Sequence, residues 1–507
     1  MTKICVPVCV DRFDKMQEAI ERTSQFADVI ELRLDYLDDI EAARKSLREL
    51  IGIIRCPLIL TLRSAEQGGS NSFDYDRRRQ FWLSLKDIPS STLCDIELDL
   101  VLEFSANATQ EQLPFSWDRV ICSHHDFSGI PSDLEQIYER MAATPAAIIK
   151  IAVQANDATD CVPIFSLLER AQREHREMIA IAMGQPGIMT RILGPSRGSF
   201  LTYASIDEES TTAPGQVTAA DLREVYRIDQ IDRETQIFGI IGNPVSHSLS
   251  PRIHNGALAA ASLNAVFMPF EVHDVKQFIR RMVHPKSREI DWDLRGLSVT
   301  APHKSTVMSS LDWIDPAAKD IGAVNTIVVR NDQLLGYNTD AAGFISALRE
   351  RFGSLNAARC AVIGTGGAAR AVLWALNAAG ANITLFARNP EKGKELSTQF
   401  SAACEPLANA RFEKFDIVIN ATPLGTRGEH QNKTAATADQ LRGVRLAYDL
   451  VYNPIETRFI REAHEAGCEI LGGIEMLLAQ AVEQFKLWTD REPDKETMRE
   501  AALRGLS

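Results

Sequence analysis

Paired cysteines are absent from this chain of 507 residues, whose nine cysteines are scattered singly. No CxxC pair and no Cys/His spacing typical of a zinc site occurs, which argues against a disulfide scaffold and predicts no metal site. Several cysteines, such as Cys5, Cys94 and Cys360, lie inside apolar runs, where they are expected to be small buried side chains. Unpaired cysteines of this kind fit a reducing cytoplasm.

Basic charge and long apolar runs are also scarce. The 55 Lys and Arg face 68 Asp and Glu, which gives a formal net charge of -13. Because phosphate backbones bind basic surfaces, nucleic acid is not an expected partner. No run has membrane-spanning length, and the core-like run at residues 4–10 leaves no room for a signal or transit peptide. We therefore expect a cytoplasmic protein that acts on small molecules, with two or three domains.

Eight short β-rich runs recur in the first 225 residues, with amphipathic helix candidates between most of them. A series of eight strands alternating with helices over this length is typical of a (β/α)8 barrel. A doubly wound open sheet is the alternative that the pattern leaves open. The runs span residues 4–10, 29–34, 57–63, 93–100, 119–125, 146–153, 178–184 and 199–205.

Charged side chains interrupt these apolar runs, mostly near the carboxyl ends of the expected strands. They are Glu31, Arg33, Arg63, His125 and Lys150. Charges are rare in buried strands because desolvation is costly, and the carboxyl ends of barrel strands are where such folds keep their chemistry. Each residue also has a structural alternative: Glu31 and Arg33 can form an ion pair, and His125 can be a satisfied core histidine.

Lys150 is the most informative of these residues, because it lies inside the apolar run AAIIKIAV. Burial favours the neutral amine of a lysine, and a neutral amine attacks a ketone to form an imine. The imine acidifies the neighbouring C–H, and His125 can move that proton near neutral pH. The arginines would hold a substrate carboxylate through paired N–H donors.

Six motifs in the first half resemble those of the type I 3-dehydroquinate dehydratases, in the same order. They are ELRLD (31–35), TLRSAEQGG (61–69), SHHDF (123–127), KIAV (150–153), MGQPGIMTR (183–191) and TAPGQ (212–216). The resemblance implies that Lys150 forms a Schiff base, that His125 is the general acid/base and that Glu31 assists or orients His125. It further implies that the substrate's carboxylate and hydroxyls are bound by Arg33, Arg63, Arg191, Thr212 and Gln216. Two positions depart from the family: Gln67 replaces a glutamate, and Thr212 stands where serine is common.

A polar, partly helical stretch at residues 221–236 precedes a new strand at 237–242. Beyond it, CAVIGTGGAARAVLWALNAAGANITLFARN (360–389) predicts a strand, a glycine-rich turn, a helix and a second strand. Such a turn lets backbone N–H groups approach a pyrophosphate, although it also occurs as a purely structural turn. NAD enzymes carry an acid near the end of the second strand, whereas this chain has Arg388 and Lys392, which indicates NADP. Further strands at 415–422 and 446–452 favour a doubly wound sheet.

Polar motifs outside this unit are candidates for a second catalytic site. GNPVSHSLSP (242–251) is a serine-rich loop suited to a polyol, and LSVTAPHK (297–304) is expected to end a strand at Lys304. GAVNT (322–326) and GYNTD (336–340) add Asn325 and Asp340. Lys304 and Asp340 can form a catalytic pair, or only a surface salt bridge of little energetic weight.

Together with DLVYNPIET (449–457) and GGIEMLLAQAVEQF (472–485), these motifs resemble the shikimate dehydrogenases from residue 238 to about 488. The resemblance implies that Lys304 and Asp340 handle the hydroxyl proton while hydride passes between the nicotinamide and the substrate. The implied substrate ligands are Ser246, Ser248, Thr300, Asn325, Tyr452 and Gln480. The implied cofactor ligands are Gly364, Thr365, Gly366, Gly367, Ala368, Arg388, Lys392, Leu450 and Gly473. Ser298 and Ala387 stand where the family usually has asparagine.

The two resemblances describe consecutive steps, from 3-dehydroquinate through 3-dehydroshikimate to shikimate. They imply a barrel over residues 1–228, a substrate-binding domain over 236–343 plus 458–507, and a Rossmann-type NADP domain over 344–457. A quinate dehydrogenase in the second half is one rival. A ligand-sensing regulator on the same folds is another, but it predicts the loss of Lys150, His125, Lys304 or Asp340, and all four are present.

Overall fold

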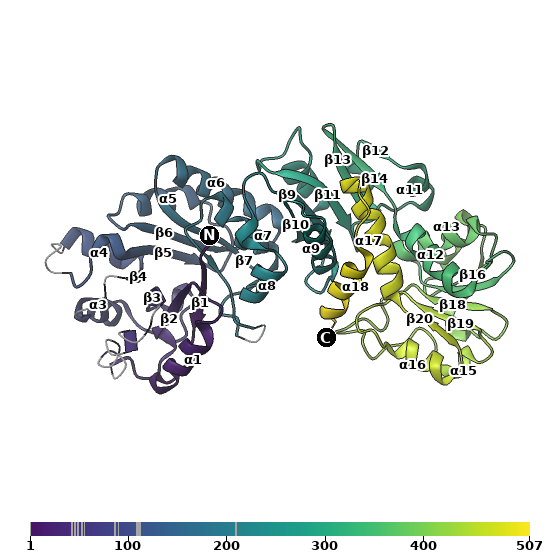
Figure 1. The fold of residues 1–507 in the computed structure, drawn as a ribbon, viewed down its shortest axis with the longest axis horizontal. Coiled ribbons are helices and arrows are strands. Elements are labelled where there is room, and N and C mark those ends of the chain that lie inside the picture. Colours follow the sequence, from purple (N-terminus) through teal and green to yellow (C-terminus); the bar gives the residue numbers. More distant parts are fainter. Residues whose placement is uncertain are drawn as a thin grey trace. The chain divides into compact units, whose positions relative to one another are not determined.

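The computed structural model describes residues 2–506, apart from residues 42, 43, 45, 46, 48, 49, 52, 53, 55, 86, 87, 90, 108–112, 208 and 209. It contains two compact units (Figure 1), one built mainly from the chain up to Thr235 and the other mainly from Gln236 onward. Within the described chain, none of the helices has both the length and the apolar content needed to cross a membrane.

The first unit is built on eight parallel strands in the order β7-β6-β5-β4-β3-β2-β1-β8. A bridge between Met178 and Ser199 links β7 to the segment leading into β8, so the sheet closes almost completely. The barrel prediction is therefore confirmed, and the open-sheet alternative is wrong. The strands are β1 (Ile4–Val8), β2 (Val29–Arg33), β3 (Leu58–Thr61), β4 (Thr92–Glu97), β5 (Val120–Asp126), β6 (Ile148–Gln154), β7 (Glu177–Met183) and β8 (Thr202–Tyr203).

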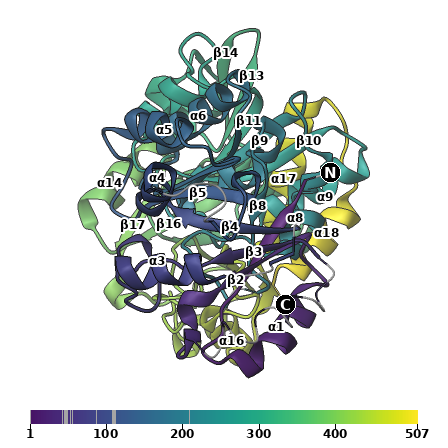
Figure 2. The same cartoon turned by 90° about the vertical axis from the view of Figure 1, so that its left-hand side faces the viewer.

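Helices alternate with these strands, and Figure 2 views the unit from the side on which α3 and α4 lie. Those described are α1 (Met16–Thr23), α3 (Tyr75–Ser84), α4 (Leu98–Asn107), α5 (Leu134–Ala142), α6 (Cys161–Arg173), α7 (Ile188–Leu193) and α8 (Ala219–Glu224). The strand expected at residues 93–100 ends earlier, because Leu98, Val101 and Phe104 are buried with helical spacing at the start of α4.

Apolar side chains pack together inside the barrel and come mostly from the first half of each strand. The cluster includes Cys5, Val29, Ile59, Ile121, Ile148, Ile179 and Leu201. Fully burying a large apolar side chain contributes about 1.5–3 kcal/mol, so this layer anchors the strands. The charged residues of the same strands follow later along the chain, so they meet above the apolar layer, at the carboxyl ends.

The second unit contains a mixed sheet in the order β10-β9-β11-β13-β14-β12. Its strands are β9 (Gln236–Gly242), β10 (Ala265–Glu271), β11 (Asp293–Val299), β12 (Trp313–Ile314), β13 (Thr326–Arg330) and β14 (Gln333–Tyr337). The helices between or after its strands include α9 (Ser250–Ala260), α10 (Val275–Phe278), α11 (Pro316–Ile321), α17 (Gly473–Thr489) and α18 (Lys495–Arg504). The strand predicted to reach Lys304 ends at Val299, before Pro302, which has no N–H for a sheet ladder. Lys304 lies in the turn that follows.

A second sheet in this unit is fully parallel, in the order β17-β16-β15-β18-β19-β20. This arrangement confirms the doubly wound nucleotide fold. The strands are β15 (Arg359–Ile363), β16 (Asn382–Ala387), β17 (Ala403–Pro406), β18 (Ile417–Asn420), β19 (Leu446–Asp449) and β20 (Glu469–Leu471). The helices are α12 (Asp340–Phe352), α13 (Gly367–Ala378), α14 (Pro390–Gln399), α15 (Ala438–Leu441) and α16 (Arg458–Glu465).

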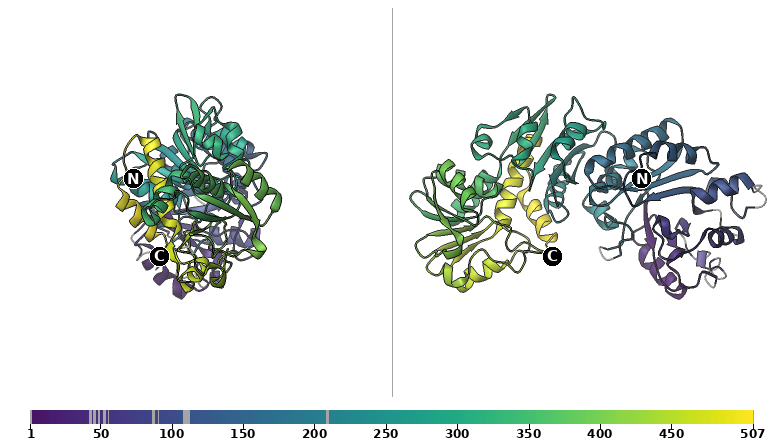
Figure 3. Two further views of the ribbon diagram at one scale, coloured as in Figure 1. Left: turned by 90° about the vertical axis from the view of Figure 1, so that its right-hand side faces the viewer. Right: turned by 180° about the vertical axis from the view of Figure 1, so that it is seen from behind.

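The C-terminal helix α17 contacts both β13 of the mixed sheet and α12 of the parallel one. In the right-hand view of Figure 3, the yellow C-terminal helices accordingly lie between the two green sheets. Strand β20 extends the parallel sheet past residue 457, where the sequence placed the end of the nucleotide-binding domain.

Candidate active sites

A single cavity at the carboxyl ends of the barrel strands collects the residues predicted for the lyase reaction. All eight predicted residues are among those that line it: Lys150, His125, Glu31, Arg33, Arg63, Arg191, Thr212 and Gln216. They come from β2, β5, β6, α7 and the segments after β3 and β8, which the parallel barrel brings to one end.

The amine of Lys150 is buried at the centre of this cavity, and the residue is 4% exposed. Its Nζ lies 2.8 Å from Asp95 Oδ2, 2.8 Å from Tyr203 Oη and 3.4 Å from Glu31 Oε1. Parallel pairing of β5 with β6 places Ser123 opposite Lys150, and His125 two residues further toward the carboxyl end. The lysine is therefore held by two carboxylates and a phenol, with an imidazole nearby.

Asp95 in β4 is the counter-ion at the base of the site. Burial alone would raise the pKa of Asp95, but the charges of Arg63 and Lys150 hold that pKa well below its usual range. Arg63 donates to Asp95 Oδ2 at 2.8 Å and to Ser123 Oγ at 2.6 Å. Asp95 is thus a fixed negative charge and a poor proton acceptor.

His125 is the residue predicted to transfer protons in this cavity. Burial lowers the pKa of His125 well below its ordinary value, and the positive charges of Arg63 and Lys150 lower it further. The lowered pKa favours the neutral imidazole, which carries one ring nitrogen that can accept a proton. Its Nδ1 has no hydrogen-bond partner among the described residues, while its backbone N–H donates to Gln67 Oε1 at 2.9 Å.

The three arginines of the cavity differ in how fully they are paired. Arg33 makes two bonds to Asp35, at 2.9 and 2.8 Å, and Arg63 is committed to Asp95 and Ser123. Arg191 is different: it donates to the backbone O of Tyr203 at 3.3 Å, and its Nε has no partner. Burial lowers the pKa of Arg191 to about 10, because no carboxylate in the described chain pairs with it.

Three details of the lyase site were not foreseen. Glu31 is hydrogen-bonded to Thr61 and lies against Lys150, and no hydrogen bond between Glu31 and His125 is found in the described structure. Asp95 and Tyr203 were missed, although both interrupt apolar strand runs, which is the signal that singled out Lys150. Thr212 and Gln216 are bonded to each other, with the Thr212 backbone N–H 2.7 Å from Gln216 Oε1.

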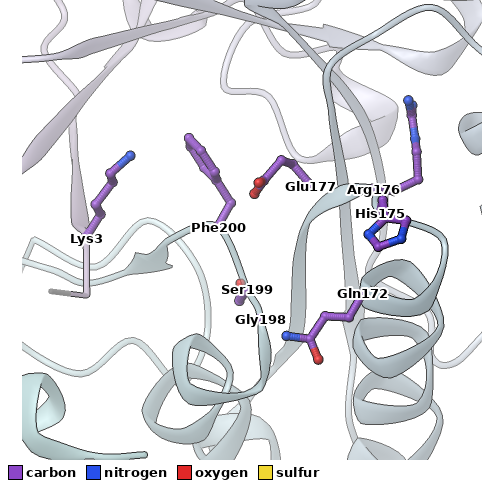
Figure 4. Close-up of a pocket in the computed structure, with 8 residues that line it drawn as sticks. All are labelled: Lys3, Gln172, His175, Arg176, Glu177, Gly198, Ser199 and Phe200. Atoms are coloured by element: carbon purple, nitrogen blue, oxygen red, sulfur yellow. The ribbon is translucent and has the colours of Figure 1, made fainter.

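A second hollow, of about 650 Å3, lies at the opposite end of the barrel (Figure 4). Lys3 precedes β1 there, and Glu177 begins β7, so this hollow is at the amino ends of the strands. None of the predicted site residues lines it. The volume of this hollow therefore does not identify it as the site of the lyase reaction.

In the second unit, Lys304 and Asp340 form an ion pair of 2.5 Å between Nζ and Oδ2. The Lys304 and Asp340 side chains are only 18% and 7% exposed, so the pair is not an ordinary surface salt bridge. Asn325 Nδ2 donates to Asp340 Oδ1 at 2.8 Å and lies 3.5 Å from Gln480 Oε1. Asp340 is the first residue of α12, where the helix dipole favours a negative charge.

The remaining predicted substrate ligands lie in loops or at strand ends. Thr300 follows β11 and pairs by its backbone with Ile241 at 2.9 Å. Ser248 is hydrogen-bonded to Tyr452, a bond that lowers the tyrosine pKa against the larger rise that burial causes. Ser246 is exposed in the same loop as Ser248. The departure at Ser298 is accommodated by a 2.9 Å bond to Gln484.

The glycine-rich turn after β15 leads into α13, which begins at Gly367 with Gly366 as its N-cap. Gly364 has a φ of +125°, and a Cβ there would lie 2.7 Å from the backbone O of Ala421, so only glycine fits. A Cβ on Gly367 would lie 3.1 Å from Lys304 Cδ. The nucleotide-binding turn, which also holds Thr365 and Ala368, therefore adjoins the Lys304–Asp340 pair.

The other predicted cofactor ligands lie at the same carboxyl edge of the parallel sheet. Arg388 directly follows β16, Lys392 lies in α14, and Leu450 directly follows β19. Gly473 begins α17, where a Cβ would lie 2.5 Å from the backbone O of Leu450. Arg388 and Lys392 are exposed and have no acidic partner in the described chain, so both suit an additional phosphate.

Four family descriptions match successive parts of the chain. Residues 4–233 match Type I 3-dehydroquinase, and residues 240–327 match the shikimate dehydrogenase substrate binding domain. Residues 346–450 match Shikimate / quinate 5-dehydrogenase, and residues 473–503 match the shikimate 5'-dehydrogenase C-terminal domain.

Whole-chain relatives have the same order of parts. The chain is 34% identical to the chloroplastic bifunctional 3-dehydroquinate dehydratase/shikimate dehydrogenase of Arabidopsis thaliana, over 97% of this chain and 83% of the relative. It is 28% identical to the shikimate biosynthesis protein AroDE of Chlamydia pneumoniae, over 96% and 95%. The chain belongs to the family of bifunctional 3-dehydroquinate dehydratase/shikimate dehydrogenases.

The second half also resembles a solved structure. A crystal structure of shikimate dehydrogenase in complex with NADP+ is 35% identical, covers 55% of this chain and 98% of its own, and has a TM-score of 0.51. These comparisons confirm the predicted family and the predicted fold classes. The roles of individual residues stay predictions.

Proposed function

We propose that the barrel dehydrates 3-dehydroquinate to 3-dehydroshikimate, and that the second unit reduces this product to shikimate. One observation carries the proposal: the eight residues predicted for the lyase meet in one cavity around the Lys150 amine. Both activities are named for the Arabidopsis relative, which the chain matches along nearly its whole length. The same parts occur here in the same order.

Lys150 supplies the nucleophile of the lyase reaction. Its amine adds to the substrate ketone, and loss of water gives a protonated imine that withdraws electrons from the neighbouring C–H bond. The neutral His125 takes that proton, and the imidazolium then protonates the departing hydroxyl, so that water leaves. Hydrolysis of the imine releases the unsaturated ketone and restores the Lys150 amine.

Arg191 is the group best suited to the substrate carboxylate, because it is a buried cation to which the described part of the chain offers no acidic partner. Thr212 and Gln216 line the same cavity and would add hydrogen bonds when their mutual bond opens. Arg33 is already paired with Asp35, and Arg63 with Asp95. We therefore assign both arginines to the substrate hydroxyls, and Arg63 also to the positioning of Asp95.

In the second unit, Lys304 and Asp340 handle the proton of the substrate hydroxyl. Asn325 fixes Asp340, while Ser246, Ser248, Thr300, Tyr452 and Gln480 are assigned to substrate binding. The cofactor is NADP, which when bound supplies or accepts the hydride. The turn at Gly364–Gly367 would hold its pyrophosphate, and Arg388 and Lys392 its 2′-phosphate. These cations disfavour an NAD-linked quinate dehydrogenase.

The domain limits follow from the sheets. We assign the barrel to residues 1–228 and the substrate-binding domain to residues 236–343. We extend the nucleotide-binding domain from residue 457 to residue 471, because β20 is a strand of the parallel sheet and α16 packs against β19 and β20. Helices α17 and α18 pack in the core of the substrate-binding domain and are assigned to it.

All nine cysteines are described and unpaired, which supports a location in a reducing cytoplasm.

Borohydride trapping with 3-dehydroquinate tests the lyase assignment. A stable adduct on Lys150 is expected, with no adduct in Lys150→Met and full NADP-linked activity in that variant. An adduct on another residue would contradict the mechanism. For the second unit, Lys304→Ala should abolish most NADP-linked shikimate oxidation while the lyase rate stays unchanged; near-full oxidation would show that the proton-transfer pair is misassigned.

A further inference from the structure

The lyase cavity contains a buried phenol that the proposed mechanism does not use. Tyr203 ends β8, is 4% exposed, and lines the cavity. Its Oη lies 2.8 Å from Lys150 Nζ and 3.3 Å from Glu31 Oε1, and Lys150 Nζ is 4.3 Å from the centre of its ring. The hydroxyl therefore joins the reacting amine to a carboxylate.

Lys150 can attack a ketone only as the free amine, not as the ammonium. A proton must leave Nζ first, and two carboxylates are close enough to receive it. Asp95 is a poor acceptor, because Arg63 and Lys150 hold its pKa well below the usual range. Glu31 is the other: in the described structure its hydrogen bonds come from Thr61, Tyr203 and Lys150, and none comes from an arginine side chain.

The direct path from Lys150 to Glu31 is long for a hydrogen bond, at 3.4 Å between Nζ and Oε1. The path through Tyr203 starts with a shorter contact of 2.8 Å; its second contact, from Tyr203 Oη to Glu31 Oε1, is 3.3 Å and must shorten for the proton to pass. A phenol can accept a proton on its oxygen while it donates its own, so it can serve as a relay.

We propose that Tyr203 is a catalytic residue that relays the proton from Lys150 to Glu31. An N–H bond of Lys150 breaks as Tyr203 Oη takes the proton, and the phenolic O–H bond breaks as Glu31 Oε1 takes the other. An ammonium and a carboxylate become an amine and a carboxylic acid, so no net charge is created in the buried site. This relay rests on the proposed function, in which Lys150 is the nucleophile.

The relay requires the phenol to stay protonated between turnovers, and its neighbours favour this. The charged and titratable groups that face it are Lys150, Glu31, Asp95, Arg63 and Cys5. Burial raises the pKa of Tyr203 well above its ordinary value, and the charge of Glu31 raises it further. Burial also raises the pKa of the Cys5 thiol, so Cys5 stays neutral and does not compete as an acceptor.

The test compares Tyr203→Phe with Tyr138→Phe in the full chain. Tyr138 is also a buried phenol bonded to a carboxylate, Glu174 at 2.7 Å, but it lies in α5 and does not line the cavity. Rapid mixing with 3-dehydroquinate and borohydride, followed by mass spectrometry, measures the rate at which the Lys150 adduct forms at several pH values. The NADP-linked activity and the circular dichroism of each variant report folding.

For Tyr203→Phe we expect the adduct to form about 100-fold more slowly near pH 7, with little change in KM. The deficit should shrink as the pH rises, because hydroxide then removes the proton from Lys150. Tyr138→Phe should match the unmodified chain. An unchanged rate, or a deficit equal at every pH, would overturn the relay and leave Tyr203 a packing role. Failure of the unmodified chain to form any adduct on Lys150 would overturn both the relay and the Schiff-base function.

Discussion

The two lysines that we propose as catalytic lie in contrasting surroundings. Lys150 is 4% exposed and contacts two carboxylates and a phenol, which are supplied by three other strands of the same barrel, β4, β2 and β8. The Lys304 side chain is 18% exposed, contacts one carboxylate and lies in a turn beside the nucleotide-binding loop. A lysine that forms a covalent bond with the substrate needs a closed, fixed environment. A lysine that only exchanges a proton while a cofactor carries the hydride can be held more openly.

Two buried aspartates extend the contrast. Asp95 in the barrel is surrounded by cations, which hold its pKa well below the ordinary value. Asp449 at the end of β19 is bound by neutral donors: Asn420, Val451 and Thr457. Burial raises the pKa of Asp449 to about 6, because no cation offsets the lost hydration. The buried carboxylate of the barrel is therefore balanced by cations, whereas that of the nucleotide-binding fold is bound by neutral donors alone.

The largest effect is expected for Asp95→Asn. Removing one partner of a buried ion pair leaves Arg63 and Lys150 undercompensated, which should cost about 3–5 kcal/mol of unfolding free energy and most of the lyase activity. Hydrogen exchange of peptides from β3, β4 and β6 measures the loss. The exposed Asp76 provides the control, because Asp76→Asn removes the same charge from the surface of the same unit. Equal stability of the two variants would show that the buried charge is not structural.

Asp340→Asn should reduce activity, as Asp95→Asn does, but with little change in stability. Shikimate oxidation should fall about 100-fold, since a general acid–base partner is lost, while stability changes little because Lys304 remains partly hydrated. Steady-state kinetics and thermal unfolding measure the two effects. Asp332→Asn, at an exposed turn, is the matched control. A large loss of stability in Asp340→Asn would mean that the second site is as dependent on buried charge as the first.

The fold was predictable because its signal is distributed over many residues. Eight apolar runs at regular spacing, and a strand–turn–helix–strand unit with Arg388 at its end, define both architectures. Element ends were less predictable, because they depend on tertiary packing: the apolar pattern of β4 runs on into α4 at Leu98, and β8 keeps only two residues.

The candidate sites were predictable where a residue matched a motif, and incomplete elsewhere. Asp95 and Tyr203 lie in the same kind of run as Lys150, but nothing in one sequence says which polar residue faces the cavity. That depends on strand register and barrel closure. For the same reason Glu31 was paired with His125, whereas the register places it against Lys150.

The two aspartates should give opposite pH dependence. The folded-state pKa of Asp449 is about 6, above an ordinary value of about 4. The contribution of Asp449 to the free energy of unfolding is therefore full at low pH and is lost as the pH rises through 6. The loss between pH 4 and 6 should be roughly 2 kcal/mol in hydrogen exchange of β18 and β19, and absent in Asp449→Asn. The contribution of Asp95 is instead lost as the pH falls below about 4. If the stability of β19 in the unmodified chain, measured by hydrogen exchange, did not change with pH, this difference would be contradicted.

The smallest effect is expected for Arg388→Leu. Losing one charge-assisted bond to the 2′-phosphate should weaken NADP binding about tenfold and leave NAD binding unchanged, as titration calorimetry with both nucleotides would show. Lys394→Ala removes an exposed cation from α14 and serves as the control. Because Arg388 is exposed, its loss should not alter stability, unlike changes to the buried barrel charges. Equal weakening for NAD and NADP would mean that Arg388 contacts the part the nucleotides share, and that cofactor choice depends on another residue.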